Sequence, residues 1–548
     1  MSELEQFCES EERNGHITCK CISKSVEFRK EGNILYNNNK KKKNDEITNR
    51  TILTYYSKSI AYAPLNCEEL ALTYSNRSVL WYHFHRYDLC LIDVNRALSI
   101  TKSNELKTSL LSRKKKCLDF KQSVSNNCKD YKIPELSEHN ASKNISCGAD
   151  SITMKQSEKY GRHYVATRDI RPGEIVIIEE SSYAAVNNHQ LYLVCSHCLA
   201  FAWACVPCDF CVFAIYCSEN CKNQAWSEYH DVMCSILPLL YSVTFKNVDM
   251  CSVIAMVRVV VIAIKKKGLE GLLKETEDSD AEKDMNLEKL LSAGKLNCRN
   301  FRSVYNLMSY EDNEVNEGLN DCISVLLSLM CKSSIIFQTQ SNKNGLTLTS
   351  MRKALEKLYK IHLLNTYTFN DFNCFCNDSE SCRTNCTSDR GIILAPCSSL
   401  INHSCDRNVS RIFLPGPKIV IYSICPIKKG EQIFDSYGPY VSMRKELRQK
   451  LVMESHRFTC ECKPCIENWS TNPDDLDTEM PESQMIYSQF FEIFGRHYQM
   501  FTQDPKVWMY NEKLFRACIK MSIQSINNTA RSKIAYLAVY QCWMDIQE

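Results

Sequence analysis

The chain is poor in glycine and proline. Its 548 residues include only 15 glycines and 14 prolines, about half the share that average usage would give. These two residue types supply the tight turns of all-β architectures, so their scarcity disfavours a turn-rich all-β fold and favours long helices. The chain is also too long for one hydrophobic core, and at ~100–200 residues per domain we expect three to five units.

A dominant charge and a long apolar run are missing as well. The balance of 67 basic and 64 acidic residues gives a net charge of +3, which excludes a global field of the kind that nucleic-acid and membrane-surface proteins carry. The best membrane candidate, Val253–Ile264, contains Arg258 and is far shorter than the ~20 apolar residues of a membrane span. We interpret it as a buried helix. The opening residues MSELEQFCESEERN do not form a secretory signal, so we expect an intracellular protein that does not associate with membranes.

Cysteine, in contrast, is abundant, with 32 residues. In a reducing compartment, clustered cysteines bind metal more often than they form disulfides. Eight residues of metal-ligand type form four close pairs, which are Cys195 and Cys198, Cys208 and Cys211, Cys217 and Cys221, and His230 and Cys234. Eight ligands make two tetrahedral zinc sites. The alternative, unrelated buried cysteines, is disfavoured because chance rarely produces this order. Cys205 falls outside the pairs, and we interpret it as a packed thiol.

This segment resembles the MYND zinc finger at every ligand position. The family interleaves its pairs, which implies that Cys195, Cys198, Cys217 and Cys221 bind one ion and that Cys208, Cys211, His230 and Cys234 bind the other. Four protein ligands leave no open position for chemistry, so the expected role is structural and protein-binding. Transcriptional corepressors are the partners that the resemblance suggests.

The N-terminal region reads as helical. Two stretches, FRKEGNILY…YYSKSIAYAP and LALTYSNRSVLWYHFHRYDLCLIDVNRAL, repeat at a period of roughly 40 residues and resemble tetratricopeptide (TPR) repeats. The helix ELKTSLLSRKKKCLDF would cap them. In TPR modules that bind the acidic tails of heat-shock chaperones, basic and Asn side chains clamp the terminal carboxylates. Arg29, Asn33, Asn76 and Arg113 match that pattern, although Ser109 stands where a clamp lysine is expected. The alternative is a scaffold of solvated helices.

Strand patterns occur on both sides of the cysteine cluster. GRHYVATRDIRPGEIVIIEE alternates apolar and polar residues around RPGE, which predicts a β-hairpin. GIILAP and RIFLPGPKIVIYSICPIKKGEQIFDSYG resume the strand character. Residues 235–370 are helical in pattern, with the acidic stretch ETEDSDAEKD expected to be an exposed loop. We therefore expect one sheet domain with insertions.

The strand regions carry three motifs, GRHYVATRDIRPGE, NHSCDRN and KKGEQIFDSYG, followed by a C-x-C-x-x-C run. Together these resemble the SET and MYND domain-containing (SMYD) lysine methyltransferase family across residues 150–470. The resemblance implies methyl transfer from S-adenosyl-L-methionine to the ε-amine of a lysine in a protein substrate, histone or non-histone, with a role in transcription. Such an in-line transfer depends mainly on the alignment of two reactants. Tyr437 matches the family's active-site tyrosine.

The resemblance also implies a set of cofactor-binding residues. They are Tyr160, Gly161, Arg162, Asn365, Asn402, His403, Tyr437 and Phe458. For Asn365 the alternative of a helix-terminal polar residue is nearly as good, and Phe458 could simply pack the post-SET segment. A third zinc ion is implied at Cys405, Cys460, Cys462 and Cys465, which would close the post-SET segment over the site. For Cys374, Cys376, Cys382 and Cys386 the spacing suits metal but has no family counterpart.

Two residues depart from the family pattern near the expected site. His456 stands where many relatives carry a tyrosine that walls the lysine channel, which leaves the catalytic rate open. Arg407 replaces the usual proline of the NHSC motif, and we interpret it as a surface-turn change. The competing hypothesis is a catalytically weak adaptor that recruits partners through its MYND and TPR surfaces.

The expected architecture is α+β and multidomain, with a β-rich SET domain split by a MYND finger and a helical insertion. The parts are an N-terminal tail 1–24, TPR-like helices 25–122, a linker 123–150, the first SET part 151–194, the MYND finger 195–234, the helical insertion 235–370, a Cys-rich loop 371–389, the second SET part 390–451, the post-SET segment 452–470 and a short C-terminal helical region 471–548. We expect a monomer. Lys40–Lys43 and Arg113–Lys116 are short basic runs that suggest both nucleus and cytoplasm, although solvated helix ends produce such runs as often.

Overall fold

The computed structural model describes a subset of the chain. The described residues are 19–39, 46–123, 135–136, 140–171, 173–281, 296–309, 317–332, 344–369, 389–414, 416–438 and 443–468. Several predictions lie outside them. These include most of the N-terminal tail, the basic run at 40–43, the first part of the linker, the four cysteines between 374 and 386, and the C-terminal region 471–548.

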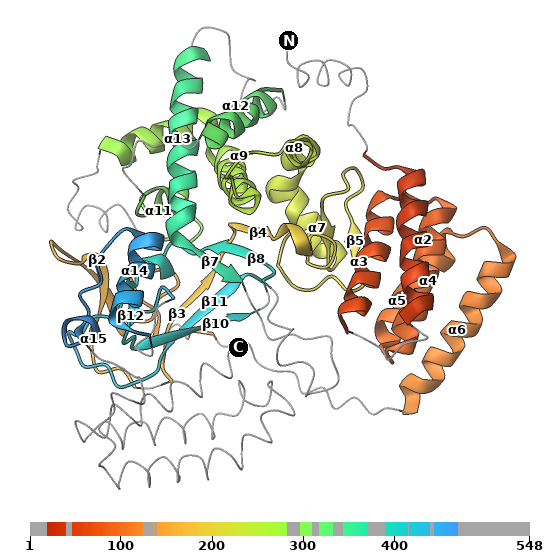
Figure 1. Ribbon diagram of the computed structural model, residues 1–548, viewed down its shortest axis with the longest axis horizontal. Helices are drawn as coiled ribbons and strands as arrows, with labels where there is room; N and C mark the ends of the chain where they lie inside the picture. Colours follow the sequence, from red (N-terminus) through yellow and green to blue (C-terminus); the bar gives the residue numbers. More distant parts are fainter. Residues whose placement is uncertain are drawn as a thin grey trace.

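Five helices form the N-terminal part, which lies at one end of the molecule (Figure 1). They are α2 (Ile22–Asn39), α3 (Glu46–Tyr62), α4 (Glu68–His83), α5 (Tyr87–Ile100) and α6 (Asn104–Ser123). Successive helices pack against each other around the buried side chains of Tyr56 and Trp81. Gly32 allows α2 to approach α3 closely, since a Cβ at that position would lie 2.7 Å from Tyr56 Cε1. Short helices that pair with their neighbours in this way fit the helix-hairpin spacing of the sequence.

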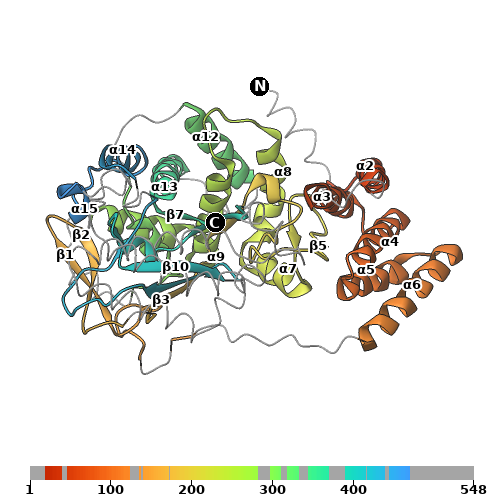
Figure 2. The ribbon, with the colours of Figure 1, turned by 60° about the horizontal axis from the view of Figure 1, so that its bottom comes forward.

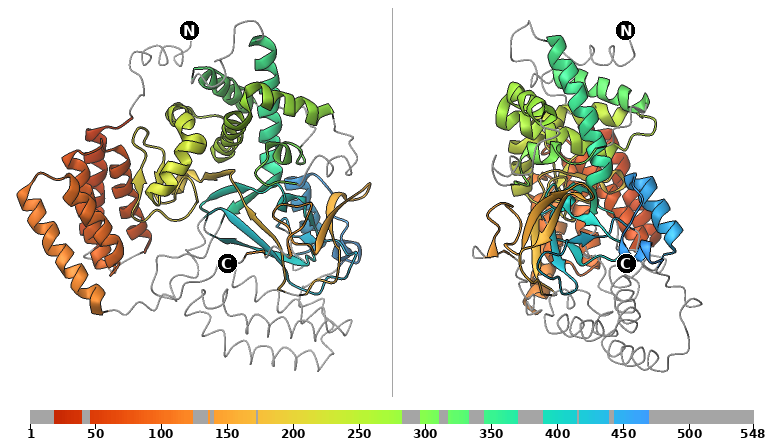
Figure 3. Two further views of the ribbon diagram at one scale, coloured as in Figure 1. Left: turned by 180° about the vertical axis from the view of Figure 1, so that it is seen from behind. Right: turned by 90° about the vertical axis from the view of Figure 1, so that its left-hand side faces the viewer.

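The cysteine-rich segment, residues 195–234, lies between these helices and the rest of the chain, and Figures 2 and 3 keep this order. Its elements are β5 (Val206–Pro207), β6 (Ile215–Tyr216), α7 (Glu219–Ala225), η3 (Trp226–His230) and the first part of α8 (Asp231–Ser242). Strands β5 and β6 pair antiparallel. Such short elements enclose little apolar core of their own, so other interactions must fix their shape.

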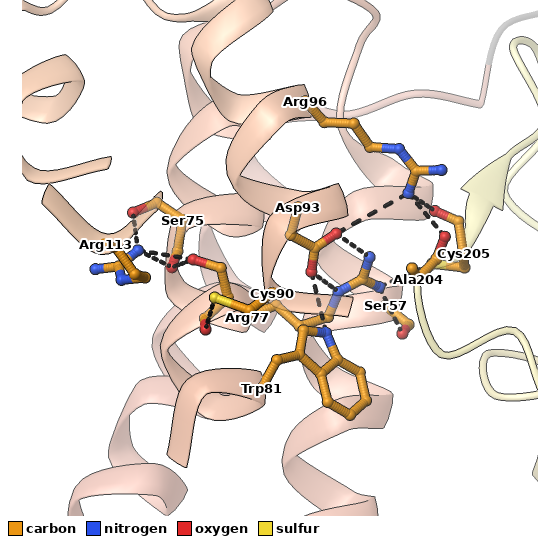
Figure 4. Close-up of polar contacts among 11 residues, drawn as sticks. Ser57, Ser75, Arg77, Trp81, Cys90, Asp93, Arg96, Arg113, Ala204 and Cys205 are labelled. Carbon is orange, nitrogen blue, oxygen red and sulfur yellow. Dashed lines mark hydrogen bonds and ion pairs between the residues drawn. The ribbon is translucent and has the colours of Figure 1, made fainter. Parts of the chain in front are cut away.

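A buried polar contact joins the N-terminal helices to this segment (Figure 4). Arg77 of α4 is fully buried and forms two hydrogen bonds of 2.8 Å with the carboxylate of Asp93 in α5. Its Nη1 also lies 3.0 Å from Cys205 Sγ. Arg96 donates to the backbone oxygens of Ala204 at 2.7 Å and Cys205 at 3.1 Å. Cys205 is buried, as expected for a packed thiol, and it also helps to anchor the two parts to each other.

The helical insertion covers one face of the strands. It consists of α9 (Met250–Ala281), α11 (Phe301–Tyr305), α12 (Glu317–Lys332) and α13 (Asn344–Asn365). Val253–Ile264 is buried throughout, as predicted. The expectation of a loop at ETEDSDAEKD is wrong at its start, because α9 continues to Ala281 beyond a kink at Gly268. Among the described helices, we find none with the length and hydropathy of a membrane span.

The described strands outside the cysteine-rich segment form several small sheets. The sheets are β1 (Ile152–Ser157) with β2 (Gly161–Ala166), β10 (Val409–Leu414) with β11 (Lys418–Ser423) and β3 (Ile175–Glu180), β4 (Ala184–Val186) with β8 (Gly391–Leu394) and β7 (Thr366–Phe369), and the pair β9 (Asn402–His403) and β12 (Phe434–Asp435). This mixture of small sheets and helices makes the fold α+β.

The predicted hairpin around RPGE is not formed. β2 pairs with β1, whereas β3 pairs with β11, so the two predicted hairpin strands lie in different sheets. The reason is that the apolar run Ile175–Ile178 of β3 needs an apolar partner, which Ile419–Ile421 of β11 supplies from a distant part of the sequence. The hairpin of β10 and β11 does form as the sequence indicates.

The C-terminal described segment contains α14 (Lys445–His456) and α15 (Lys463–Ile466). Both lie beside β12 in Figure 1. Residues 140–150, which we expected to be part of a linker, pack against β3 instead, with Ala149 N donating to Val176 O at 2.8 Å. The two strand regions and the post-SET segment are thereby gathered at one end of the molecule.

Candidate active site and zinc centres

The cysteine-rich segment brings its eight ligand residues together in two groups. Within each group, the candidate ligand atoms all lie within 4.8 Å of one another. The first group is Cys195, Cys198, Cys217 and Cys221, and the second is Cys208, Cys211, His230 and Cys234. The interleaved pairing implied by the sequence resemblance is therefore the pairing that the fold produces.

Local structure explains how the ligands converge. Ser218 caps α7 by accepting from Cys221 N, which directs the Cys221 side chain back toward Cys217 at 3.5 Å. In the second group, His230 Nε2 lies 3.3 Å from Cys208 Sγ and 3.5 Å from Cys211 Sγ. Thiolate sulfurs and an imidazole nitrogen at this separation fit a tetrahedral zinc ion.

A third group forms where the chain folds back on itself. Cys405 follows β9, whereas Cys460, Cys462 and Cys465 belong to the segment around α15. Cys405 Sγ lies 3.9 Å from Cys460 Sγ and 3.7 Å from Cys465 Sγ. An ion held by these four donors would fasten the segment 457–466 beside β9.

Tyr437 lies at the point where these parts meet. Its hydroxyl donates to Ile401 O at 2.8 Å, and its backbone N–H donates to His403 Nδ1 at 3.1 Å. The parallel pairing of β12 with β9 sets this register, with Asp435 opposite His403. Burial raises the pKa of Tyr437, so the phenol keeps its proton at neutral pH. Burial also lowers the pKa of His403 to about 4.

The expected cofactor residues of the first and second SET parts lie next to each other. Asn402 Nδ2 donates to Tyr160 O at 2.8 Å, which joins the β1–β2 turn to β9. Gly161 has a φ of +57°, a conformation that favours glycine. A Cβ built on Gly161 would meet nothing within 4 Å. Open space therefore adjoins the loop whose residues we expect to hold a cofactor.

Arg162 and Asn365 connect this loop to the helical insertion. Arg162 Nη2 donates to Asn306 O. Asn365, at the end of α13, donates to Met308 O at 2.9 Å, and its carbonyl accepts from Ser399 Oγ at 3.1 Å. Both anchors fix the residues that follow α11. The described contacts of Asn365 are those of a positioning residue within the protein.

Aromatic rings surround the Tyr437 side chain. The His456 ring centroid lies 4.6 Å from that of Tyr437, and the His403 ring centroid lies 5.3 Å from it. The Phe458 ring is 6.2 Å from His403 and is partly exposed. His456 thus occupies the neighbourhood of Tyr437 in which the resemblance expects a second tyrosine.

The interpretation of Arg407 as a surface-turn residue is wrong. Arg407 is 5% exposed and lies 3.8 Å from the carboxylate of Asp435. Arg411 of β10 forms a second, closer ion pair with the same carboxylate. Asp435, two residues before Tyr437, is thereby held by two guanidinium groups. The sequence analysis did not identify Asp435 as a site residue. The signal that could have identified it is its position in the DSYG motif, which also contains Tyr437.

Comparison with known proteins agrees with this geometry. The SET-domain family model matches residues 161–438, which is about half of the chain. The chain belongs to the SET-domain family. Its SET domain thus spans the cysteine-rich segment and the helical insertion, from the Gly161 loop to the residue after Tyr437.

Several curated proteins are similar to most of the chain. "Protein-lysine N-methyltransferase SMYD4" of Pongo abelii is 24% identical, and the match covers 82% of this chain and 68% of that protein. A SET and MYND domain-containing protein of Dictyostelium discoideum is 23% identical, covering 69% of this chain and 96% of that protein. "Histone-lysine N-methyltransferase SMYD3" of Mus musculus is 25% identical, covering 69% and 74%. The chain is thus similar over most of its length to proteins that carry both SET and MYND domains.

Among solved structures, the SET domain of LSMT bound to lysine and AdoHcy is 12% identical. It covers 52% of this chain and 49% of that chain. The TM-score is 0.20, which is too low to support any argument about the arrangement of the site. The chain spans about two thirds of the length of the SMYD4 proteins that it matches, with 68% for Pongo abelii and 66% for Mus musculus.

Proposed function

We propose that this chain is an S-adenosyl-L-methionine-dependent protein-lysine N-methyltransferase. The observation that carries the proposal is the convergence of Tyr437, Asn402 and the open Gly161 loop from three distant parts of the chain. The names of the SMYD4 and SMYD3 relatives support the same activity. The chemistry that the cofactor supplies is a methyl group on a sulfonium, ready for displacement by an amine.

The residues of the chain have to position the two reactants. Asn402 holds the Tyr160 carbonyl and so fixes the loop at which Gly161 leaves room for a ligand. Tyr437 is oriented from both ends, by Ile401 at its hydroxyl and by His403 at its backbone. Orientation of this kind is the main contribution to an in-line transfer.

The incoming lysine must be neutral, although its free pKa is about 10.4. Burial disfavours the ammonium form, because a charged group loses its hydration. The rings of Tyr437, His403 and His456 provide such an environment. Since burial raises the pKa of Tyr437, its hydroxyl stays protonated at neutral pH and does not act as a base.

Substituting Tyr437 tests the proposal. Tyr437→Phe in the full chain should lower the rate of methyl transfer from labelled cofactor to proteins of a cell extract by about 100-fold or more, the loss typical of a positioned hydrogen-bonding group. The affinity for S-adenosyl-L-methionine, measured by calorimetric titration, should change by less than about threefold, because the phenyl ring remains.

Tyr241→Phe is the matched control. Its hydroxyl contacts Asn188 near the cysteine-rich segment, and both quantities should stay at the parent values. The alternative is an adaptor that recruits partners such as corepressors without transferring methyl groups. A parent chain that binds no S-adenosyl-L-methionine would overturn the enzyme proposal and favour the adaptor.

We further propose that the two zinc ions of the cysteine-rich segment and the one of the post-SET segment are structural. Each group offers four protein donors, which fill a tetrahedral zinc ion and leave no position for a substrate. Binding such ions would contribute to folding, since segments of this size have little core. Zinc removal should therefore unfold the cysteine-rich segment, and unchanged circular dichroism and proteolysis after exhaustive chelation would overturn this role.

For the N-terminal helices we propose a scaffold role in preference to chaperone binding. Arg29 is paired with Glu69 at 2.5 Å, and Arg113 donates to Ser78 Oγ at 2.7 Å and Ser75 O at 3.1 Å. Asn33 Oδ1 accepts from Asn76 at 2.9 Å. A carboxylate ligand would have to displace these internal partners.

An acidic chaperone-tail peptide should therefore bind the full chain no better with a free terminal carboxylate than with an amidated one. Fluorescence anisotropy at two salt concentrations measures this. Salt-sensitive binding of the free-carboxylate peptide alone, weakened by Arg113→Ala, would instead establish a carboxylate clamp.

A further inference from the structure

A fourth cluster of metal-ligand residues lies in the core of the SET domain. The Cys147 and Cys298 sulfurs and a Glu179 carboxylate oxygen lie within 4.8 Å of one another, and all three residues are buried. In the described residues, this spacing is met by this cluster and by the three cysteine groups above. The cluster does not depend on the motifs of the sequence analysis, and the proposed methyl transfer does not use it.

Backbone pairing fixes the position of the two thiols. Residues 144–148 run between β3 and residue 296, with Ile178 N donating to Cys147 O at 2.9 Å on one side. On the other side, Ser146 N donates to Leu296 O at 2.9 Å. Cys298 follows two residues later. The donors are thus presented by segments that are hydrogen-bonded to each other, as in a site whose geometry is set before a ligand arrives.

A third thiol adjoins the cluster. Cys397 follows β8, and its backbone N–H donates to Glu179 Oε1 at 3.0 Å. Cys397 is itself buried, but its sulfur is not among the donor atoms that all lie within 4.8 Å of one another. The two thiols and the carboxylate oxygen of the cluster are donor types suited to zinc.

The carboxyl group of Glu179 is buried and held by hydrogen bonds from the turn after β8. Glu179 has 0% exposure, and Ser398 donates to its Oε2 from both N and Oγ at 2.7 Å. These contacts fix the orientation of the Glu179 side chain, and burial raises the pKa of its carboxyl group. A divalent ion beside the Cys147 and Cys298 thiols would stabilise the ionised carboxylate, because an opposite charge at close range favours it.

We propose that Cys147, Glu179 and Cys298 form an additional zinc site. The ion would join three segments that are distant in sequence, namely the stretch before β1, β3 and the stretch before α11. Glu179 also holds the turn after β8 through Cys397 N and Ser398 N. That turn leads through η4 (Ser398–Leu400) to Asn402 and His403. The zinc ion would therefore stabilise the turn that leads to Asn402 and His403, two of the expected cofactor-binding residues.

Zinc counting tests the proposal. The full chain, purified without chelators, should contain four zinc ions by mass spectrometric metal analysis, whereas the MYND-like and post-SET groups account for three. Cys298→Ser and Cys147→Ser should each contain three. Cys322→Ser is the matched control, since Cys322 is a buried thiol in α12 outside the four groups, and it should retain four.

A second variant tests whether a fourth zinc ion comes instead from the cysteines between 374 and 386. The double substitution Cys374→Ser and Cys376→Ser should also retain four zinc ions. If Cys298→Ser fails to fold, the parent count and this double variant still decide the matter. A parent chain with three ions, a fourth ion lost on substituting Cys374 and Cys376, or a Cys147–Cys298 disulfide in a non-reduced peptide map would each overturn the proposal.

Discussion

At the scale of single residues, the most informative side chains are those that are buried and polar. His362 of α13 is fully buried, and its Nδ1 donates to Leu358 O at 2.8 Å. Burial lowers its pKa to about 4. The residue thus stays neutral in the folded protein under conditions in which a free histidine, with a pKa of about 6.5, takes up a proton.

This difference predicts loss of stability in acid. Between pH 6.5 and 4 the unfolded chain binds a proton at His362 that the folded chain does not, so the free energy of unfolding falls as the pH falls. The contribution reaches about 3 kcal/mol over this window. Denaturant unfolding of the parent and His362→Leu should show a smaller pH dependence for the variant. Substituting the exposed His189 by Gln serves as the control, and an equal effect there would contradict the assignment.

Arg407 shows why residue-level prediction reached only part of the site. The motif residues Asn402, His403 and Tyr437 were found because each stands in a short characteristic string. The prediction that Arg407 lies in a surface turn is wrong because its partner, Asp435, is in β12, which only folding brings close to it. The cluster of Cys147, Glu179 and Cys298 was missed for the same reason, since its members are far apart and belong to no motif.

At the scale of elements, helices were predicted better than strand pairings. The apolar run at Val253–Ile264 marks a buried helix by composition alone. A strand must also find a partner, and the partner of β3 is β11, not the neighbouring β2. The choice depends on which apolar strand fits the core, and local periodicity does not contain that information.

The acidic end of α9 is helical although its composition does not predict a helix. Its composition resembles an exposed loop, yet the helix continues to Ala281. Part of the reason lies in tertiary contacts, because Asp280 forms an ion pair with Lys357 of α13 at 2.6 Å and accepts from the Tyr305 hydroxyl at 3.2 Å. Such partners stabilise a helix end that propensity alone leaves undecided.

At the scale of the whole molecule, the N-terminal helices and the SET domain are held together through the cysteine-rich segment. The central contact is the buried group of Arg77, Asp93 and Cys205, with Trp81 Nε1 donating to Asp93 at 3.1 Å. The buried Arg77 guanidinium depends on Asp93, because removing that carboxylate leaves an uncompensated buried charge.

Asp93→Ala should therefore destabilise the N-terminal helices by about 3–5 kcal/mol. The double substitution Arg77→Met and Asp93→Leu should recover part of this loss, since no unpaired charge remains. Thermal unfolding together with limited proteolysis measures both. Asp88→Ala, which removes the exposed pair with Arg86, should change stability by less than about 1 kcal/mol. A comparable loss for Asp88→Ala would show that burial is not the cause.

The pairing of β3 with β11 has a consequence for synthesis on the ribosome. β3 aligns Glu180 with Lys418, and more than two hundred residues separate the two in the chain. At ~5–20 residues per second, β3 is made roughly ten to fifty seconds before its partner strand exists. The cysteine-rich segment and the helical insertion are translated in that interval, and their ligands and apolar faces lie close together in sequence. The SET domain is thus completed only after the N-terminal helices, the cysteine-rich segment and the helical insertion have been made.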